Sequence, residues 1–183
     1  GTSAFQNCTT LTKVTMPDSV EMIGINAFNG CTALEEVIFS DALISIGDNA
    51  FRECTSLKGI KFPMGLETIG RNAFYQCAGM VGDLIIPDSV TSLGVAAFYN
   101  CTSLDGELKL SASLTSIPIS AFFGCGKLTG DLIIPEGVMS IGDSAFYQCA
   151  GFNGKIELPD TLQTIDYSAF YGCENIVGEL VIP

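Results

Sequence analysis

The motif Ala-Phe-x-x-Cys recurs through the whole chain and constrains its fold more than any other feature. It occurs eight times in 183 residues and contains every cysteine: Cys8, Cys31, Cys54, Cys77, Cys101, Cys125, Cys149 and Cys173. Successive cysteines are 23 residues apart in the first half of the chain and 24 in the second. A unit of this length cannot bury its apolar side chains alone, whereas copies stacked in register bury a continuous column. The sequence therefore predicts a solenoid.

After each cysteine comes a segment that alternates apolar and polar residues, which is typical of a short strand. In the first unit, Val14 and Met16 are predicted to point inward and Thr15 outward. Proline ends this strand in six units, and Ser40 and Ser111 take its place in the other two. Because proline cannot donate to a strand ladder, it marks the end of the strand.

The second half of each unit leads back to Ala-Phe. It begins with an apolar pair three residues apart, such as Val20 and Ile23. Ser or Asn then precedes Ala-Phe in every unit except that of Ala96, which favours the N-cap of one short helical turn. The 24-residue units carry an extra residue beside a glycine, for which we expect a positive φ. These glycines are Gly82, Gly106, Gly130, Gly154 and Gly178.

The unit LPDTLQTIDYSAFYGCENIVGELVIP and its siblings resemble leucine-rich repeats of the BspA-like, or Treponema, type. That type has the pattern L-x-x-I-x-x-x-A-F-x-x-C-x-x-L-x-x-I-x-I-P, and the resemblance covers essentially the whole chain. It implies a right-handed, mostly β solenoid with parallel strands on the concave side and short helical or irregular turns on the convex side. It also implies a bacterial protein that is extracellular or on the cell surface, with relatives thought to act in adhesion to host matrix proteins or other cells.

We expect residues 1–183 to form one domain of about eight units. Terminal units of a solenoid need polar outer faces. Here the first unit begins at its Ala-Phe turn, and the last ends with residues of core type, Leu180 and Ile182. Our interpretation is an uncapped segment of a longer protein, whose ends could associate with another copy.

The charge of the chain excludes two classes of partner. Twenty acidic residues against eight basic ones give a net charge of -12, which repels nucleic acids and anionic lipid. No window approaches about 18 uninterrupted apolar residues, and no basic start precedes an apolar run. We therefore expect no nucleic-acid partner and no membrane insertion.

The cysteines could form disulfides, hold a metal or act as nucleophiles. Neighbours in a parallel stack lie about 4.8 Å apart, whereas the β-carbons of a disulfide lie about 3.8 Å apart. The chain has no histidine and no C-x-x-C, so it lacks convergent zinc ligands and the usual catalytic base. We expect reduced, buried thiols that act as small apolar residues, no cofactor and no enzymatic activity.

The concave sheet is the expected binding face, because repetition builds a surface larger than one unit offers. Its outward column is Thr15, Ile38, Lys61, Ile85, Lys109, Ile133, Glu157 and Val181. The preceding column is Lys13, Glu36, Gly59, Asp83, Glu107, Asp131, Lys155 and Glu179. From the two columns we select as ligand-binding residues Ile38, Lys61, Asp83, Ile85, Glu107, Lys109, Asp131, Ile133 and Glu157.

Two features of these columns have alternative interpretations. The aliphatic residues either reflect strand propensity or mark a contact surface. The run Asp83, Glu107 and Asp131 stacks like charges, which costs repulsion. A basic partner or a cation such as calcium would relieve that repulsion, and so would water and counterions.

Two functions follow from these patterns. The first is a non-catalytic module that binds a protein or glycan, host matrix included, through the concave face. The alternative is a structural spacer or self-assembling stalk. Binding hot spots favour Trp, Tyr and Arg, yet the chain has no Trp. A tyrosine follows the motif's Phe at Tyr75, Tyr99, Tyr147 and Tyr171, so the convex side is a second candidate face.

Overall fold

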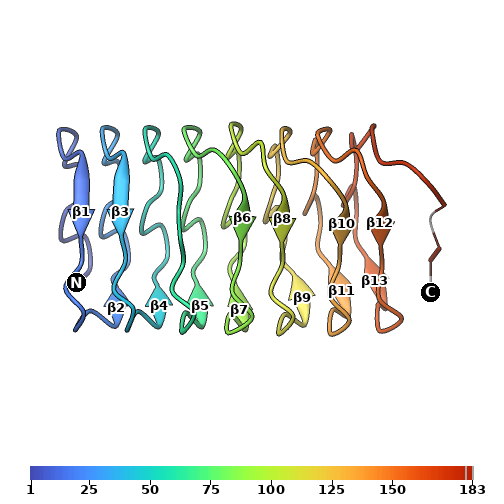
Figure 1. Ribbon diagram of the computed structural model, residues 1–183, viewed down its shortest axis with the longest axis horizontal. Coiled ribbons are helices and arrows are strands. Elements are labelled where there is room, and N and C mark those ends of the chain that lie inside the picture. Colours follow the sequence, from blue (N-terminus) through green and yellow to red (C-terminus); the bar gives the residue numbers. More distant parts are fainter. Residues whose placement is uncertain (180, 183) are drawn as a thin grey trace.

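The computed structural model describes residues 1–179, 181 and 182. The chain winds through units that lie side by side in a row, with its two termini at opposite ends (Figure 1). Strands and turns make up the described residues, which contain no helix and hence none able to cross a membrane. The predicted parallel-strand solenoid is confirmed, and the turns are irregular rather than helical.

The strand that follows the cysteine forms the first ladder of the solenoid. Its members are β1 (Lys13–Thr15), β3 (Glu36–Ile38), β6 (Leu84–Ile85), β8 (Leu108–Lys109), β10 (Leu132–Ile133) and β12 (Ile156–Glu157). Pairing is parallel and in register, so that Val14 lies beside Val37. Met16 is buried and Thr15 exposed, which confirms the predicted alternation.

A second strand, which the sequence analysis missed, precedes each Ala-Phe turn from Ala27 onward. These strands are β2 (Met22–Ile23), β4 (Ser45–Ile46), β5 (Thr68–Ile69), β7 (Ser92–Leu93), β9 (Ser116–Ile117), β11 (Ser140–Ile141) and β13 (Thr164–Ile165). They form a four-stranded sheet, β2-β4-β5-β7, and a three-stranded sheet, β13-β11-β9. Two residues are too few to show an alternating pattern. The sequence feature that could have indicated these strands is the recurring Ser-Ile or Thr-Ile pair, because the β-branched Ile favours strands.

The Ser or Asn before Ala-Phe does not cap a helix, so that prediction was wrong. All eight residues at this position, Ala96 included, have φ between 51° and 55°. An N-cap residue has extended backbone, whereas this is the left-handed region that Asn tolerates best. The residue before each cysteine is also left-handed, with φ from 55° at Asn100 to 79° at Gly172. Two left-handed residues four positions apart leave no room for a helical turn.

These turns form a third hydrogen-bond ladder between units. The amides of Asn26, Phe28 and Gly30 donate to the carbonyls of Asp48, Ala50 and Arg52 at 2.8 to 2.9 Å. The amides between them bond within their own unit, as in Asn29 N–H to the Asn26 carbonyl at 3.2 Å. The turn ladder therefore joins neighbouring units on a third side, in addition to the two strand ladders, and pairs backbone groups that burial would otherwise leave unsatisfied.

The repeated phenylalanines stack into one continuous column beneath the turns. Neighbouring ring centroids from Phe5 to Phe170 are 5.2 to 5.7 Å apart, and the rings are within 8° of parallel. The interior rings, such as Phe74 and Phe98, are fully buried, whereas Phe5 in the first unit is 50% exposed. Ile182 is also exposed at the other end, while Leu180 and Pro183 lie outside the described residues.

The cysteine thiols from Cys31 to Cys173 donate hydrogen bonds to the preceding unit. Cys77 Sγ donates to the Phe51 carbonyl at 3.0 Å, and the six other cysteines from Cys31 to Cys173 make the equivalent bond at 3.1 to 3.2 Å. The Phe51 carbonyl also accepts the Cys54 amide of its own unit at 3.2 Å. All eight thiols are free. A cysteine fits this position because it is small and apolar and still donates weakly.

Candidate functional site

The outward side chains of the first ladder form an exposed surface, which we call the strand face. All of the selected residues in both columns are exposed. Ile85 and Ile133 are 54% and 53% exposed, and Ile38 is 44% exposed. The selected residues are therefore accessible to a partner, while their role in binding stays a prediction.

Two ion pairs lie on the strand face. Lys13 Nζ is 2.8 Å from Glu36 Oε2, and Lys109 Nζ is 3.9 Å from Asp88 Oδ2. The side chains of both pairs are more than half exposed, so each contributes little to stability. Lys109 in particular remains available to other partners.

Carboxylates of the acidic column hold backbone groups of the next unit. Asp83 Oδ1 accepts the Glu107 amide at 2.9 Å, and Asp131 Oδ1 accepts the Lys155 amide at 2.7 Å. In return, Gly82 N–H donates to Asp105 Oδ1 at 2.8 Å. Gly130 N–H likewise donates to Asn153 Oδ1 at 3.0 Å. We call this reciprocal pair of bonds the Asx clasp.

The Asx clasp joins units two by two. It links the units of β6 and β8 and those of β10 and β12, which are also the strands that pair. β8 and β10 belong to different sheets, and within the described residues the first ladder joins their units only at a bridge between Glu107 and Thr129. Along the first ladder the units in this half of the chain are thus joined in pairs, although β9 and β11 still pair across the break between β8 and β10. We call that break the seam.

The glycines beside the extra residue follow the same alternation. Gly82, Gly130 and Gly178 have φ of 80° to 96°, as predicted, but Gly106 and Gly154 do not lie in that region. These two are glycines for another reason: an added Cβ at Gly106 would clash with Asp83 Oδ1, and one at Gly154 with Asp131 Oδ1. Close approach of the clasping carboxylate, not backbone conformation, requires glycine there.

A groove of about 610 Å³ opens along the seam. Its walls include Leu108, Leu110, Ile133 and Pro135, together with Ala112 and Lys109, and its acidic lining residues are Asp88, Glu107, Asp131 and Glu136. The selected residues Glu107, Lys109, Asp131 and Ile133 therefore lie together. Ile38 and Lys61 line a separate groove of about 450 Å³, so the nine residues do not form a single site.

The sequence analysis offered calcium or a basic partner as ways to relieve repulsion in the acidic column, and the structure bears on the calcium alternative. Asp83 and Asp131 are engaged by backbone amides, a structural role that the sequence analysis did not foresee. Over residues 1–179, 181 and 182, no three acidic or cysteine side chains converge as they would around a metal ion. The calcium alternative therefore has no geometric support, and the basic-partner alternative is taken up below.

The tyrosines of the turns stack into an outer column that Phe123 completes. Centroids from Tyr75 through Tyr99, Phe123 and Tyr147 to Tyr171 are 4.6 to 4.9 Å apart, and the Arg52 guanidinium lies 4.6 Å from the Tyr75 centroid. Burial raises the pKa of Tyr99, and Tyr75 adds to the effect. Because each ring covers its neighbour, the inner rings have no free face for a ligand to stack on.

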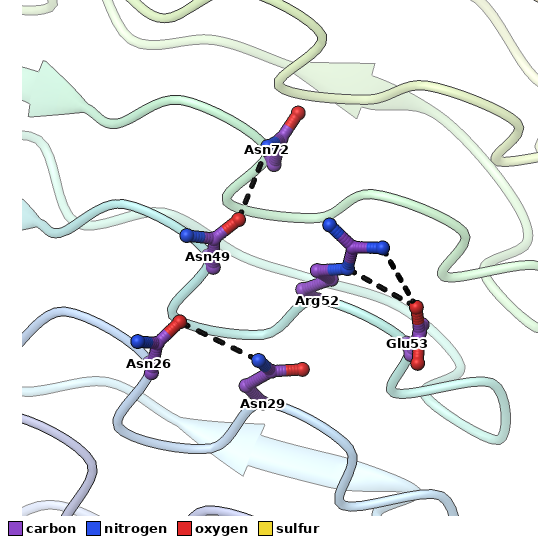
Figure 2. A network of polar contacts seen from close by, with 6 residues as sticks. All are labelled: Asn26, Asn29, Asn49, Arg52, Glu53 and Asn72. Atoms are coloured by element: carbon purple, nitrogen blue, oxygen red, sulfur yellow. Dashed lines mark hydrogen bonds and ion pairs between the residues drawn. The ribbon is translucent and has the colours of Figure 1, made fainter.

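Polar side chains reinforce the turns of the early units (Figure 2). Asn72 Nδ2 donates to Asn49 Oδ1 at 3.1 Å across units. Arg52 binds Glu53 Oε1 through Nε and Nη2 at 3.1 and 3.0 Å. Asn49, Glu53 and Asn72 are left-handed turn positions, so these contacts serve the scaffold.

The buried thiols are unreactive by their environment. Burial raises the pKa of Cys54 to about 12, with a further rise from Cys31, and raises the pKa of Cys173 to about 11. The pKa of Cys77 is raised well above its usual value, again chiefly by burial. The thiolate is the nucleophile, so these groups stay protonated at neutral pH.

The comparisons with known proteins agree with this architecture. The model of the BspA type leucine rich repeat region matches residues 1–105 and 106–182, in six copies. This family is generally one of non-catalytic repeat proteins that serve in protein interaction. Among curated proteins, none matches this chain.

Similar solved structures come from several bacteria. The leucine-rich repeat protein of T. pallidum is 34% identical with a TM-score of 0.74, over 88% of this chain and 72% of that one. A Bacteroides ovatus leucine-rich repeat protein is 30% identical with a TM-score of 0.75, over 96% and 50% of the two chains. A leucine rich cell surface protein of Faecalibacterium prausnitzii is 27% identical with a TM-score of 0.62, over 96% and 61%.

The chain thus spans only half of the Bacteroides protein, and the fold that it shares with these relatives is the stacked repeat itself. The family model covers nearly every residue, including those of the Phe column, the thiol bonds and the strand ladders described above. This chain belongs to the BspA type leucine-rich repeat family.

Proposed function

We propose that the chain is a non-catalytic interaction module of a secreted or cell-surface protein, and that it binds a protein or glycan through the strand face. One observation carries the proposal: the buried positions repeat in every unit, while the outward column changes. Phe74, Phe98 and Phe122 are identical layers, whereas the outward positions between them alternate between aliphatic and charged side chains.

Two further observations support this function. The cell-surface relative from Faecalibacterium prausnitzii supports the location. The absence of histidine from the sequence and the raised pKa values of the buried thiols support a role without chemistry. A surface with exposed Ile85 and Ile133 among charged groups has the mixed character of a contact face.

The test is binding of the chain to an array of extracellular-matrix proteins and glycans, beside a variant with Ile85→Asp, Lys109→Glu and Ile133→Asp. A matched control carries Thr91→Asp, Thr115→Glu and Met139→Asp, three exposed positions before strands of the second ladder. We expect a ligand that only the strand-face variant loses, with both variants folded by circular dichroism. Equal binding by all three proteins would contradict the proposal.

A second candidate function is a spacer or self-assembling stalk. It is favoured by the unbroken Phe column, which makes each unit a rigid extension of the last. In that case strand-face substitutions leave function unchanged, and sedimentation detects association that grows with concentration. Phe5→Asp, at the exposed end of the Phe column, would then reduce the association.

A further inference from the structure

The groove at the seam differs in charge from the other polar groove of the strand face. The second groove, about 530 Å³, is lined by Lys13, Lys58, Glu35 and Glu36 with Thr12 and Gly59, and its charges balance. The seam groove has four exposed carboxylates and one ammonium group, that of Lys109. The net charge of -12 adds to its attraction for cations.

A bare metal ion does not fit this groove. No three of its carboxylates converge on a point, within the part of the chain that the structure describes. Asp131 already accepts the Lys155 amide through Oδ1. Asp88 accepts the Ala112 amide through Oδ1 at 3.0 Å, and its Oδ2 lies 3.9 Å from Lys109 Nζ. The other oxygen of Asp131 and the carboxylates of Glu107 and Glu136 line the same groove, as suits several cationic groups on one partner chain.

A glycan fits the groove poorly as well. Sugar sites commonly use aromatic faces, and neither column of the strand face contains an aromatic residue. The outer aromatic column lies over the turns, and its inner rings cover one another at 4.6 to 4.9 Å. The apolar part of the groove is aliphatic: Leu108, Leu110, Ile133 and Pro135.

Arginine side chains match both parts of this surface. Their aliphatic stems can lie on Ile133 and Pro135 while the guanidinium groups reach carboxylates, which they bind in a bidentate geometry. The Leu108 backbone can also bind a polypeptide partner, because its N–H and C=O groups face the seam. Leu84 and Ile86 amides donate to Glu107 and Lys109 carbonyls, so the alternation of a parallel strand turns the Leu108 backbone toward the seam.

On these grounds we propose that the seam groove recognises an arginine-rich, aliphatic polypeptide segment of the partner. The guanidinium groups bind Asp88, Glu107, Asp131 and Glu136, and Ile133 supplies the apolar contact. This inference rests on the proposed function of the strand face and narrows its ligand from protein or glycan to a basic polypeptide.

The probe is a fluorescein-labelled peptide of repeated Arg-Leu-Gly triplets, with a second peptide in which every Arg is Gln. Asp131→Asn with Glu136→Gln removes two charges from the groove and keeps an Oδ1 acceptor for Lys155. Asp18→Asn with Glu21→Gln makes the same charge change at exposed positions in the first two units. Fluorescence anisotropy of each protein at low and high salt gives the affinities.

We expect binding of the Arg peptide that the groove variant weakens about tenfold and the control variant less than about twofold, with loss of affinity at high salt. The Gln peptide should not bind. Equal weakening by both variants would show a general charge effect and overturn the inference, as would equal binding of the two peptides.

The matrix and glycan array separates this failure from failure of the strand-face function. In one outcome the Arg peptide does not bind, while an array ligand binds the chain and not the strand-face variant. That result would support the strand-face function and contradict the arginine inference. If that array ligand is a glycan, the choice of polypeptide is wrong.

Discussion

The turns and the strand face are built by opposite rules. Beneath the turns, every unit places the same Phe and Cys side chains, because each layer rests on the next: Phe98 stacks on Phe74 at 5.3 Å, and Cys101 Sγ donates to the Phe74 carbonyl at 3.2 Å. On the strand face, Ile85, Lys109 and Ile133 follow one another and point to solvent. Identity marks the positions that hold the solenoid together, and variation marks those free to recognise something else.

Among substitutions that test this division between turns and strand face, we expect the largest loss of stability in the Phe column. Phe98→Ala removes a fully buried ring with stacked neighbours on both sides, and should lower the free energy of unfolding by about 3 to 5 kcal/mol. Urea unfolding monitored by circular dichroism measures the loss. Phe5→Ala, at a half-exposed ring, should cost well under half as much, and equal losses would mean that the column does not carry the stability.

The thiol ladder predicts a loss of stability at alkaline pH. Burial raises the pKa of Cys54 from 9.0 to about 12. Between these values the unfolded chain gives up a proton that the native chain keeps, so the free energy of unfolding falls as pH rises, by up to about 1.4 kcal/mol per pH unit for each such thiol. Urea unfolding under reducing conditions between about pH 8 and pH 10.5 measures the slope.

Cys54→Ala should make that slope shallower, because one of the titrating thiols is gone. Tyrosine and lysine titrations contribute equally to both proteins, so the difference isolates Cys54. An unchanged slope would mean that Cys54 is not held protonated in the native state.

The Asx clasp should have a smaller effect. Asp83→Ala removes the acceptor of the Glu107 amide and should cost about 1 kcal/mol, whereas Asp83→Asn keeps an Oδ1 acceptor and should cost less. Chemical denaturation measures both. Glu157→Ala, at an exposed position of the outward column, is the control, and a cost as large as that of Asp83→Ala would argue against the clasp.

The smallest effect on stability is expected at the outward column itself. Lys109→Glu changes a side chain that is 65% exposed and should alter the free energy of unfolding by less than about 0.5 kcal/mol. The same substitution should abolish ligand binding in the array. Loss of stability without loss of binding would reverse the division between turns and strand face.

The sequence predicted most of the solenoid because the same Phe and Cys side chains recur every 23 or 24 residues. The Ala-Phe-x-x-Cys spacing located the core, and the alternation around Thr15 located the first ladder. It could not show the second ladder, because pairs such as Ser45–Ile46 are too short for a pattern. Nor could it show that Asn26 is left-handed, since Asn is favoured at N-caps and is also tolerated in that conformation.

For the candidate site, the sequence predicted exposure but not grouping. Both columns of the strand face followed from period-two alternation. The seam did not, because it depends on which strands fail to pair. A signal existed in the change from Gly82-Asp83 to Asp105-Gly106 and back to Gly130-Asp131, which places the acidic side chain after and before glycine in turn. That order decides which partner each carboxylate holds.

The outer aromatic column gives the molecule its own optical reporter. The chain has five tyrosines and no tryptophan, and four of the tyrosines lie in this one stack. Near-ultraviolet circular dichroism, which disappears when fixed side-chain packing is lost, therefore arises largely from the order of the later units. The far-ultraviolet signal follows the whole backbone, so comparing the two during unfolding would tell whether the tyrosine-bearing half melts before, with or after the rest.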